Sequence, residues 1–251
     1  MNIPSLMEML KAGVHFGHRT SRWHPNMEPY IFGERSGVHI IDLEKTQKKM
    51  EEAREFLRNL GMEGRTLLFV GTKKQAHSLI EKKAEECEMP YVVLRWIGGA
   101  LTNFHTIRKR VKHYMELVAK RDSGELSKYT KKEQHDFNKE IEDLRRKVGG
   151  LVKLEKLPDA VFIMDTKTEK TALREALRKK IPVIAVCDTN VNPEGIKHVI
   201  PANDDALKSV EIMIEFVAES LKEGRKLQSA REQVKKMEED KKKKNKTEEK
   251  K

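Results

Sequence analysis

Short runs of apolar residues recur along the chain between stretches with helical periodicity. The runs lie at 38–41, 66–70, 91–94, 160–164 and 183–186. They are continuous rather than alternating, which is typical of strands buried on both faces of a parallel sheet. We therefore predict an α/β fold with three layers, in which a doubly wound parallel sheet of five strands is covered by helices on both faces.

The segments between these runs space their apolar residues as helices do. In the helix predicted at 50–60, Gly61 follows the last apolar position and is expected to be a C-cap. Thr166 and Glu169 have the spacing of a capping box, which predicts the start of another helix there. Two further amphipathic helices are predicted at 76–87 and 206–221.

One region departs from this alternation. Apolar residues recur at 107, 111, 114 and 118, and again at 137, 141, 144 and 148, on either side of a Ser123-Gly124 turn and a capping box at Thr130 and Glu133. Two facing apolar seams predict an antiparallel coiled-coil hairpin inserted at 104–150. The α/β domain then comprises 1–103 and 151–223. The polar, basic tail at 224–251 buries nothing, and we expect it to be disordered or a frayed helix.

Positive charge is concentrated in two of these segments. The formal net charge is +11 at pH 7. Residues 104–150 contain 13 Lys or Arg against 8 Asp or Glu, residues 222–251 contain 13 against 7, and the rest of the chain has 25 of each. Because each Lys or Arg near a phosphate releases counterions, this segregation favours a nucleic-acid partner over a merely solvated surface.

Cysteine content and hydropathy indicate the compartment. Cys87 and Cys187 are too few for a disulfide framework in 251 residues. The N-terminus has no basic region ahead of an apolar stretch, and no run of 18 apolar residues occurs. We expect a cytoplasmic protein without a membrane partner.

Motifs for enzyme chemistry are weak. GTKKQ at 71–75 lacks the spacing of a phosphate-binding loop, and IGGALTN at 97–103 lacks the third glycine of a dinucleotide fingerprint. No G-x-S-x-G elbow occurs. We therefore predict no enzyme activity, no catalytic residue, no required cofactor and no small-molecule substrate.

Aspartates at strand ends are the best argument against that prediction. Asp165 and Asp188 end two predicted strands, and Asp204 and Asp205 follow a short loop later. Converging carboxylates often hold a divalent cation for phosphoryl transfer, so the alternative is a metal-dependent phosphatase or a nucleotide-binding enzyme. A single aspartate after a strand more often caps a turn. Asp188, Asp204 and Asp205 are our candidates for a structural divalent cation.

Histidines, arginines and a tryptophan gather near the N-terminus. The members of this group are His15, His18, Arg19, Arg22, Trp23 and His24. Zinc is disfavoured because no cysteine lies nearby to complete a ligand set. Flat aromatic and cationic side chains suit RNA, whose loop bases stack on them. Arg95 and Trp96 form a second such pair, although core packing competes for either tryptophan.

At these residues the sequence resembles a known family. Four segments, in order, are similar to small-subunit ribosomal protein two of bacteria and organelles. They are AGVHFGHRTSRWHPNMEPYIFGERSGVHIIDLEKT at 12–46, LLFVGTKKQA at 67–76, RWIGGALTNFHTI at 95–107, and PDAVFIMD with IPVIAVCDTNVNPEGIKHVIPANDDALKSV through Val210. The resemblance covers roughly the first 220 residues. Val191 and Asn192 depart from the smaller residue and the aspartate that are usual there.

The resemblance implies a five-stranded flavodoxin-like sheet with an inserted coiled-coil hairpin. It implies a structural constituent of the ribosome that takes part in translation and has no enzyme activity. Its expected partners are ribosomal RNA, contacted between the head and body of the small subunit late in assembly, and neighbouring proteins. One of these is small-subunit protein one, which captures messenger RNA. A protein-binding scaffold without RNA remains a third possibility, for which salt would matter little.

We expect RNA to be recognised by its shape and its phosphates, with cations setting the position of the protein. The candidate contact residues are Arg19, Arg22, Trp23, Lys73, Lys74, Arg95, Trp96, Arg108, Lys109 and Arg110.

Overall fold

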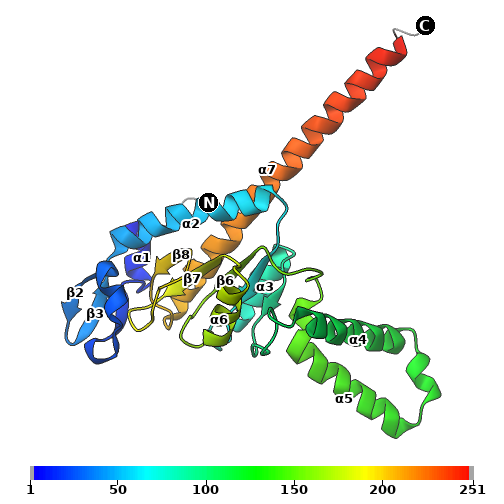
Figure 1. Cartoon of the computed structure of the whole chain (residues 1–251), viewed down its shortest axis with the longest axis horizontal. Helices are drawn as coiled ribbons and strands as arrows, with labels where there is room; N and C mark the ends of the chain where they lie inside the picture. Colours follow the sequence, from blue (N-terminus) through cyan, green and yellow to red (C-terminus); the bar gives the residue numbers. More distant parts are fainter. Residues whose placement is uncertain (1–2, 249–251) are drawn as a thin grey trace.

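The chain folds into one α/β body from which two helical segments project (Figure 1). This computed structural model describes residues 3–248. One projection is a pair of helices inserted in the middle of the chain, and the other is the far end of the last helix (Figure 1). Among the described residues, none of the helices is both long and apolar enough to cross a membrane.

The centre of the body is a parallel sheet of five strands in the order β5-β4-β6-β7-β8. Numbered within the sheet, this is the 2-1-3-4-5 order of flavodoxin-like folds, so the predicted sheet is confirmed. The strands are β4 (Leu67–Val70), β5 (Tyr91–Val92), β6 (Ala160–Ile163), β7 (Val183–Cys187) and β8 (His198–Pro201).

One of the five predicted strands was placed in the wrong sheet. Residues Val38–Ile41 form β3, which pairs antiparallel with β1 (Phe16–Arg19) and β2 (Ile31–Arg35) in a separate sheet of three strands. The fifth parallel strand is β8 instead. Its sequence does not form an apolar run, because it begins with a half-buried histidine and ends in Pro201, a residue that sheets tolerate at an edge.

The two faces of the parallel sheet carry separate cores, as three layers require. Leu67 and Phe69 point to one face and Leu68 and Val70 to the other, as the two-residue period of a strand dictates. The first face is covered by α2 (Leu43–Met62), α3 (His77–Glu86) and α7 (Leu207–Glu248), and the second by α6 (Lys170–Arg178) and the root of the inserted helices. A short helix, α1 (Leu6–Lys11), precedes the small sheet.

Gly61 does not cap α2, which continues to Met62. It lies instead where α2 crosses α7. A Cβ at Gly61 would come 2.4 Å from the Leu221 carbonyl oxygen, and one at Gly224 would come 2.1 Å from the Arg58 carbonyl oxygen. The two glycines therefore let the helix backbones approach closely.

The inserted segment is a hairpin of two helices, α4 (Phe104–Asp122) and α5 (Lys131–Val148). The capping box of Thr130 and Glu133 is present and starts α5. The predicted seam is buried at its root, although Leu117 is buried where Val118 was expected. The fold confirms the helical hairpin, and its winding as a coiled coil stays a prediction.

The other predicted capping box is absent. Helix α6 begins at Lys170, one residue after Glu169, and has no side-chain cap. Glu169 accepts hydrogen bonds from the Thr72 amide and hydroxyl instead. The turn before α6 is closed by Asp165, whose Oδ1 accepts from the amides of Lys167 and Thr168.

The tail continues α7 as a helix to Glu248, one of the two states that its composition allowed. Residues 249–251 of the tail lie outside the described residues.

Candidate RNA interface and carboxylate cluster

The carboxyl ends of four parallel strands converge at one edge of the sheet, as the sequence predicted. Lys73 follows β4, Asp165 follows β6, Asp188 follows β7, and the pair Asp204 and Asp205 follows β8. In doubly wound folds this edge is where ligands bind, at the point where the strand order reverses.

Lys73 lies at the centre of these carboxylates. Its Nζ is 3.0 Å from Asp165 Oδ2 and 2.8 Å from Oδ1 of both Asp204 and Asp205. The Asp204 side chain is 2% exposed, whereas that of Asp205 is 56% exposed. Because the ammonium group is shared by three carboxylates, Lys73 is not an available cation for a phosphate. These ion pairs fix the loop that carries the exposed Lys74.

His18 joins the cluster from β1. Its Nδ1 is 3.1 Å from Asp188 Oδ1, and its Nε2 is 3.5 Å from Asp205 Oδ2. The backbone amide of His18 donates to Thr189 Oγ1 at 2.9 Å, which ties the small sheet to the end of β7. From the sequence, His18 was grouped only with its N-terminal neighbours. Its contact with Asp188 spans about 170 residues and leaves no local pattern in the sequence.

Burial and mutual repulsion set the proton affinities here. Burial, followed by the charges of Asp165 and Asp188, raises the pKa of Asp204 to about 7. Burial alone would lower the pKa of Lys73, but its hydrogen bonds to Asp204 and Asp205 outweigh that effect and raise it. The hydrogen bond to Asp188 raises the pKa of His18. The carboxylates of the cluster therefore favour positive charge beside them, which is supplied by Lys73 and by either a proton on His18 or a metal ion that replaces it.

His18, Asp188 and Asp204 also have the donor set of a metal site. One ligand atom from each lies within 4.8 Å of the others. One imidazole nitrogen and two carboxylate oxygens suit zinc or another divalent transition metal. Of the three predicted metal candidates, Asp188 and Asp204 belong to this set and Asp205 does not. Both Asp204 and Asp205 also lie 2.8 Å from Lys73. Asn192, which stands where the family usually has an aspartate, is not one of these three residues and accepts a hydrogen bond from Asn26. Its difference from the family therefore does not change the set of possible ligands.

The loop between β5 and α4 is held by a single buried carboxylate. Glu175 of α6 accepts hydrogen bonds from Trp96 Nε1 at 3.1 Å and from the amides of Gly99, Leu101 and Thr102. Burial would raise the pKa of Glu175, but these backbone donors outweigh it and lower the pKa. Trp96 is thereby a core residue. The role of Glu175 could not be seen in the sequence, because a glutamate on an amphipathic helix is usually a residue of the solvent-exposed face.

The remaining candidates for RNA contact are partly or fully exposed. Arg108 is half-buried and donates to the Val152 carbonyl oxygen at 3.4 Å. Trp23 is 38% exposed, with its ring 5.3 Å from that of His39. Among the side chains of residues 3–230, no carboxylate pairs with any of the others, which are Arg19, Arg22, Lys74, Arg95, Lys109 and Arg110.

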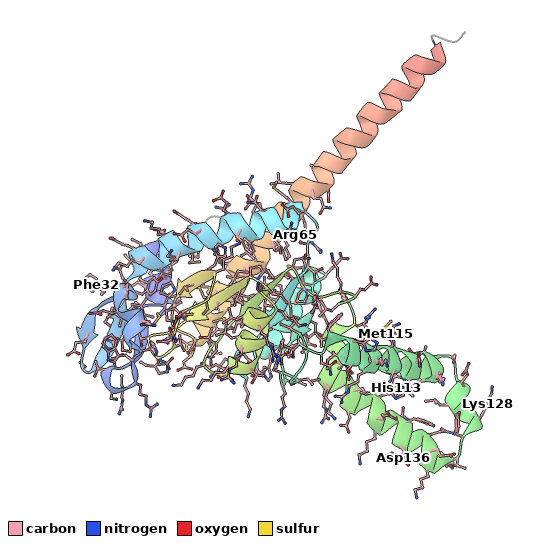
Figure 2. The ribbon with its side chains drawn as sticks, viewed as in Figure 1. Phe32, Arg65, His113, Met115, Lys128 and Asp136 are labelled. Atoms are coloured by element: carbon pink, nitrogen blue, oxygen red, sulfur yellow. The ribbon has the colours of Figure 1, made fainter. Side chains whose placement is uncertain are left out.

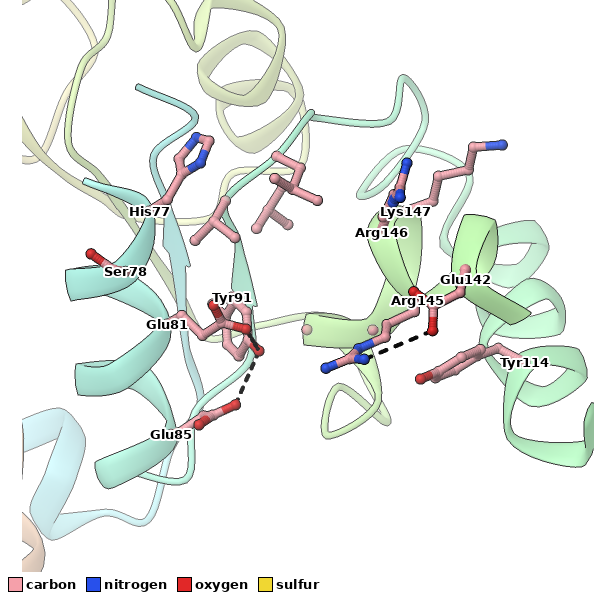
Figure 3. Close-up of a pocket in the computed structure, with 15 residues that line it drawn as sticks. His77, Ser78, Glu81, Glu85, Tyr91, Tyr114, Glu142, Arg145, Arg146 and Lys147 are labelled. Atoms are coloured by element: carbon pink, nitrogen blue, oxygen red, sulfur yellow. Dashed lines mark hydrogen bonds and ion pairs between the residues drawn. The ribbon is translucent and has the colours of Figure 1, made fainter. Parts of the chain in front are cut away.

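A cleft of about 540 Å³ separates the root of the hairpin from α3 (Figure 3). Glu81 and Glu85 on the α3 wall accept hydrogen bonds from the Tyr91 hydroxyl at 2.8 and 3.1 Å. The opposite wall carries cations near the end of α5, namely Arg145, Arg146 and Lys147. Glu142 lies on the same wall, 3.9 Å from Arg145. This wall is therefore basic on balance, and it extends the cationic surface of the hairpin root.

An apolar groove of about 360 Å³ lies at the other end of the body, between α1 and the small sheet. Leu6, Met7, Leu10 and Phe32 line it, and Phe32 is 79% exposed (Figure 2). Its lining charges are both acidic, Asp42 and Glu44. A groove of this kind suits apolar protein side chains better than a phosphate backbone.

The fold and these surfaces together define a flavodoxin-like α/β protein with an inserted hairpin and exposed basic loops. The family model of ribosomal protein S2 matches residues 9–224. The chain is 47% identical over 225 residues to small ribosomal subunit protein uS2 of Coprothermobacter proteolyticus, an alignment that covers 90% of this chain and 84% of that protein. The chain therefore belongs to the ribosomal protein S2 family, and the predicted membership is confirmed. It is a small-subunit ribosomal protein with a structural role in translation, located in the ribosome.

Proposed function

We propose that the protein binds small-subunit ribosomal RNA through exposed cations at the hairpin root and at the strand-end loops. The observation that carries this proposal is that some cations form ion pairs with carboxylates and others do not. Lys73 is neutralised by three carboxylates, whereas Arg95, Lys109 and Arg110 have no carboxylate partner among the described residues. Unpaired cations gain the most from a phosphate, because no internal ion pair has to break first.

The RNA is read mainly by its shape. The cations belong to several different elements of the body, so they match a folded RNA surface rather than one extended strand. The resemblance to the family implies a position between the head and body of the small subunit and entry late in assembly, and we propose both for this chain.

Charge reversal tests this proposal. In the test variant Arg108, Lys109 and Arg110 become Glu, and in the control Arg178, Lys179 and Lys180, at the end of α6, become Glu. Both changes alter the net charge equally, but α6 ends at the opposite edge of the sheet. We expect the first variant to be lost from assembled small subunits in sucrose gradients and the control to be retained. Equal incorporation of both variants would contradict the proposal.

We further propose that the apolar groove beside Phe32 docks small-subunit ribosomal protein one. Several large apolar side chains around this groove are exposed, and an apolar surface of this size commonly marks a protein contact. The acidic lining disfavours RNA as the occupant. A protein partner that captures messenger RNA would then sit at the end of the body away from the hairpin.

This docking can be measured by the retention of protein one on purified small subunits. Replacing Met7 and Phe32 with Ser should release it, while Met115→Ser, an exposed methionine of the hairpin, should not (Figure 2). Retention by the groove variant, or release by Met115→Ser, would overturn the assignment.

The carboxylate cluster is proposed as a structural element rather than a catalytic one. A nucleophile or general base must reach its substrate, and Asp165 and Asp204 are 4% and 2% exposed and already bonded to Lys73. We propose instead that His18, Asp188 and Asp204 hold a structural divalent cation. Metal analysis of the purified protein should find stoichiometric metal that Asp188→Ala removes. Absence of metal, with no change in thermal stability on Asp188→Ala, would reject this site.

A further inference from the structure

A second cavity opens at the strand-end edge, beside the carboxylate cluster but separate from its ligands. Its volume is about 290 Å³. It lies between the loop that follows β6, the start of α6 and the loop that follows β7. The lining side chains are His24, Thr166, Lys167, Lys170, Leu173, Asn190, Val191 and Asn192.

Two residues that line this cavity carry buried polar atoms whose hydrogen bonding is incomplete. Asn190 Oδ1 makes no hydrogen bond among residues 3–230. The Thr166 hydroxyl, on a residue that is 3% exposed, has only the buried thiol of Cys187 as a hydrogen-bond partner there. A buried polar atom without a partner costs free energy, and a thiol is only a weak partner, so both oxygens would gain from a hydrogen bond to a ligand. A ligand that fits this cavity would carry groups that form hydrogen bonds with these two residues.

The other walls suit a flat ring. Leu173 and Val191 supply apolar surface. The imidazole of His24 is held by the Asn26 amide, which donates to its Nδ1 at 3.2 Å. Fixed imidazole rings and aliphatic side chains are surfaces on which unpaired RNA bases stack.

Cations complete the site. Lys167 and Lys170 line the same cavity and are exposed, and neither pairs with a carboxylate in the described part of the chain. They can reach the phosphates on either side of an inserted nucleotide. The volume is at the lower end of the range for ligand pockets, which admits one base and excludes a dinucleotide.

We infer that this cavity binds one unpaired nucleobase of the small-subunit ribosomal RNA, with Thr166 and Asn190 at its hydrogen-bonding edge and Lys167 and Lys170 on its flanking phosphates. The inference rests on the proposed RNA-binding function and deepens it. Phosphate contacts fix the position of the protein, whereas a captured base gives one point of sequence-specific contact.

The test is chemical probing of small-subunit ribosomal RNA bound to the full chain. Dimethyl sulfate and a carbodiimide reagent report the Watson–Crick edges of unpaired bases. The wild-type protein should protect one unpaired base. Leu173→Phe, which fills the cavity, and Thr166→Val, which keeps the shape but removes the hydroxyl, should each lose that protection and weaken binding roughly 10-fold, since stacking contributes about 1–3 kcal/mol per base. The slope of affinity against salt should not change.

A further variant, in which Gln replaces both Lys167 and Lys170, avoids any change in the core. It should weaken RNA binding and lower the slope of log affinity against log salt. The inference is overturned if the filled and hydroxyl-free variants keep every base protection and full affinity. It is also overturned if the cavity binds free mononucleotides but protects no base in the RNA. Loss of binding on reversal of Arg108, Lys109 and Arg110 would in those cases leave the proposed function standing, so the two failures are distinguishable.

Discussion

The strand-end edge of the sheet and the root of the hairpin both carry many charges, but they use them differently. At the edge, Lys73 and His18 lie against four carboxylates, and most of these groups are buried. At the root, Lys109 and Arg110 project from α4 into solvent with no carboxylate partner among the described residues. The first arrangement holds loops together, and the second leaves charge available to a partner.

The comparison teaches that a cation in a sequence is not yet a binding residue. Lys73 and Lys74 are adjacent and were equal candidates for RNA contact. One is the centre of an internal ion network and the other is exposed. Which of them can meet a phosphate depends on carboxylates that follow about 90 and 130 residues later in the chain.

The largest effect should come from removing the central lysine. Lys73→Met leaves Asp165 and Asp204 buried without their cation and should lower the free energy of unfolding by about 3–5 kcal/mol. Lys74→Met, the matched control at an exposed position, should change it by less than about 0.5 kcal/mol. Urea denaturation followed by circular dichroism measures both. Equal unfolding midpoints for the two variants would show that the cluster is not a stabilising network.

The pH dependence of stability should reveal Asp204. Its pKa is raised from 3.8 in the unfolded chain to about 7 in the fold, so the folded state keeps a proton that the unfolded state loses between these values. Stability contributed by the protonated group is therefore lost as pH rises from about 4 to 7, by about 4 kcal/mol.

Asp204→Asn should remove this dependence of the free energy of unfolding on pH, because the Asn amide carries no titrating proton. Asp205→Asn, at the exposed end of the network, should leave the slope in place. Parallel pH curves for the wild type and Asp204→Asn would refute the assignment.

A smaller effect is expected at Glu175, where a buried carboxylate binds backbone amides rather than a lysine. Glu175→Gln keeps the shape but removes the charge, and should cost about 1–2 kcal/mol. Hydrogen exchange should quicken at the amides of Gly99, Leu101 and Thr102. Unchanged exchange there would mean that the loop is held by packing alone.

The smallest effect on stability belongs to the hairpin root. Arg110→Ala should change the free energy of unfolding by less than about 0.5 kcal/mol while lowering the slope of log affinity for RNA against log salt by roughly 1. A destabilised variant with an unchanged slope would place Arg110 in the structural group with Lys73.

The sequence predicts what depends on local period and spacing. The buried strands β4, β6 and β7, the helical hairpin with the Thr130 capping box, and the convergence of strand-end aspartates could all be predicted in this way. Family membership could be predicted from four segments in order. These features depend on residues close together in the chain or on the rule that parallel strands end at one edge.

What could not be predicted depends on partners distant in the chain. Residues 38–41 look like a core strand, but pairing with β1 and β2 places them in the antiparallel sheet. Gly61 looks like a cap, but α7 passes over it. Glu169 and Glu175 look like helix surface, but each binds a loop from another part of the sheet edge. In each of these cases a long-range contact overrides the local signal.

The central claim is that the exposed cations of the hairpin root, and not the charges of the strand-end cluster, bind the RNA. The most direct test is the salt dependence of binding between the full chain and small-subunit ribosomal RNA. Reversing Arg108, Lys109 and Arg110 to Glu should lower the slope of log affinity against log salt by roughly 3, and reversing Arg178, Lys179 and Lys180 should leave it unchanged. Equal slopes for the wild type and both variants, or an equal loss in both, would contradict the claim.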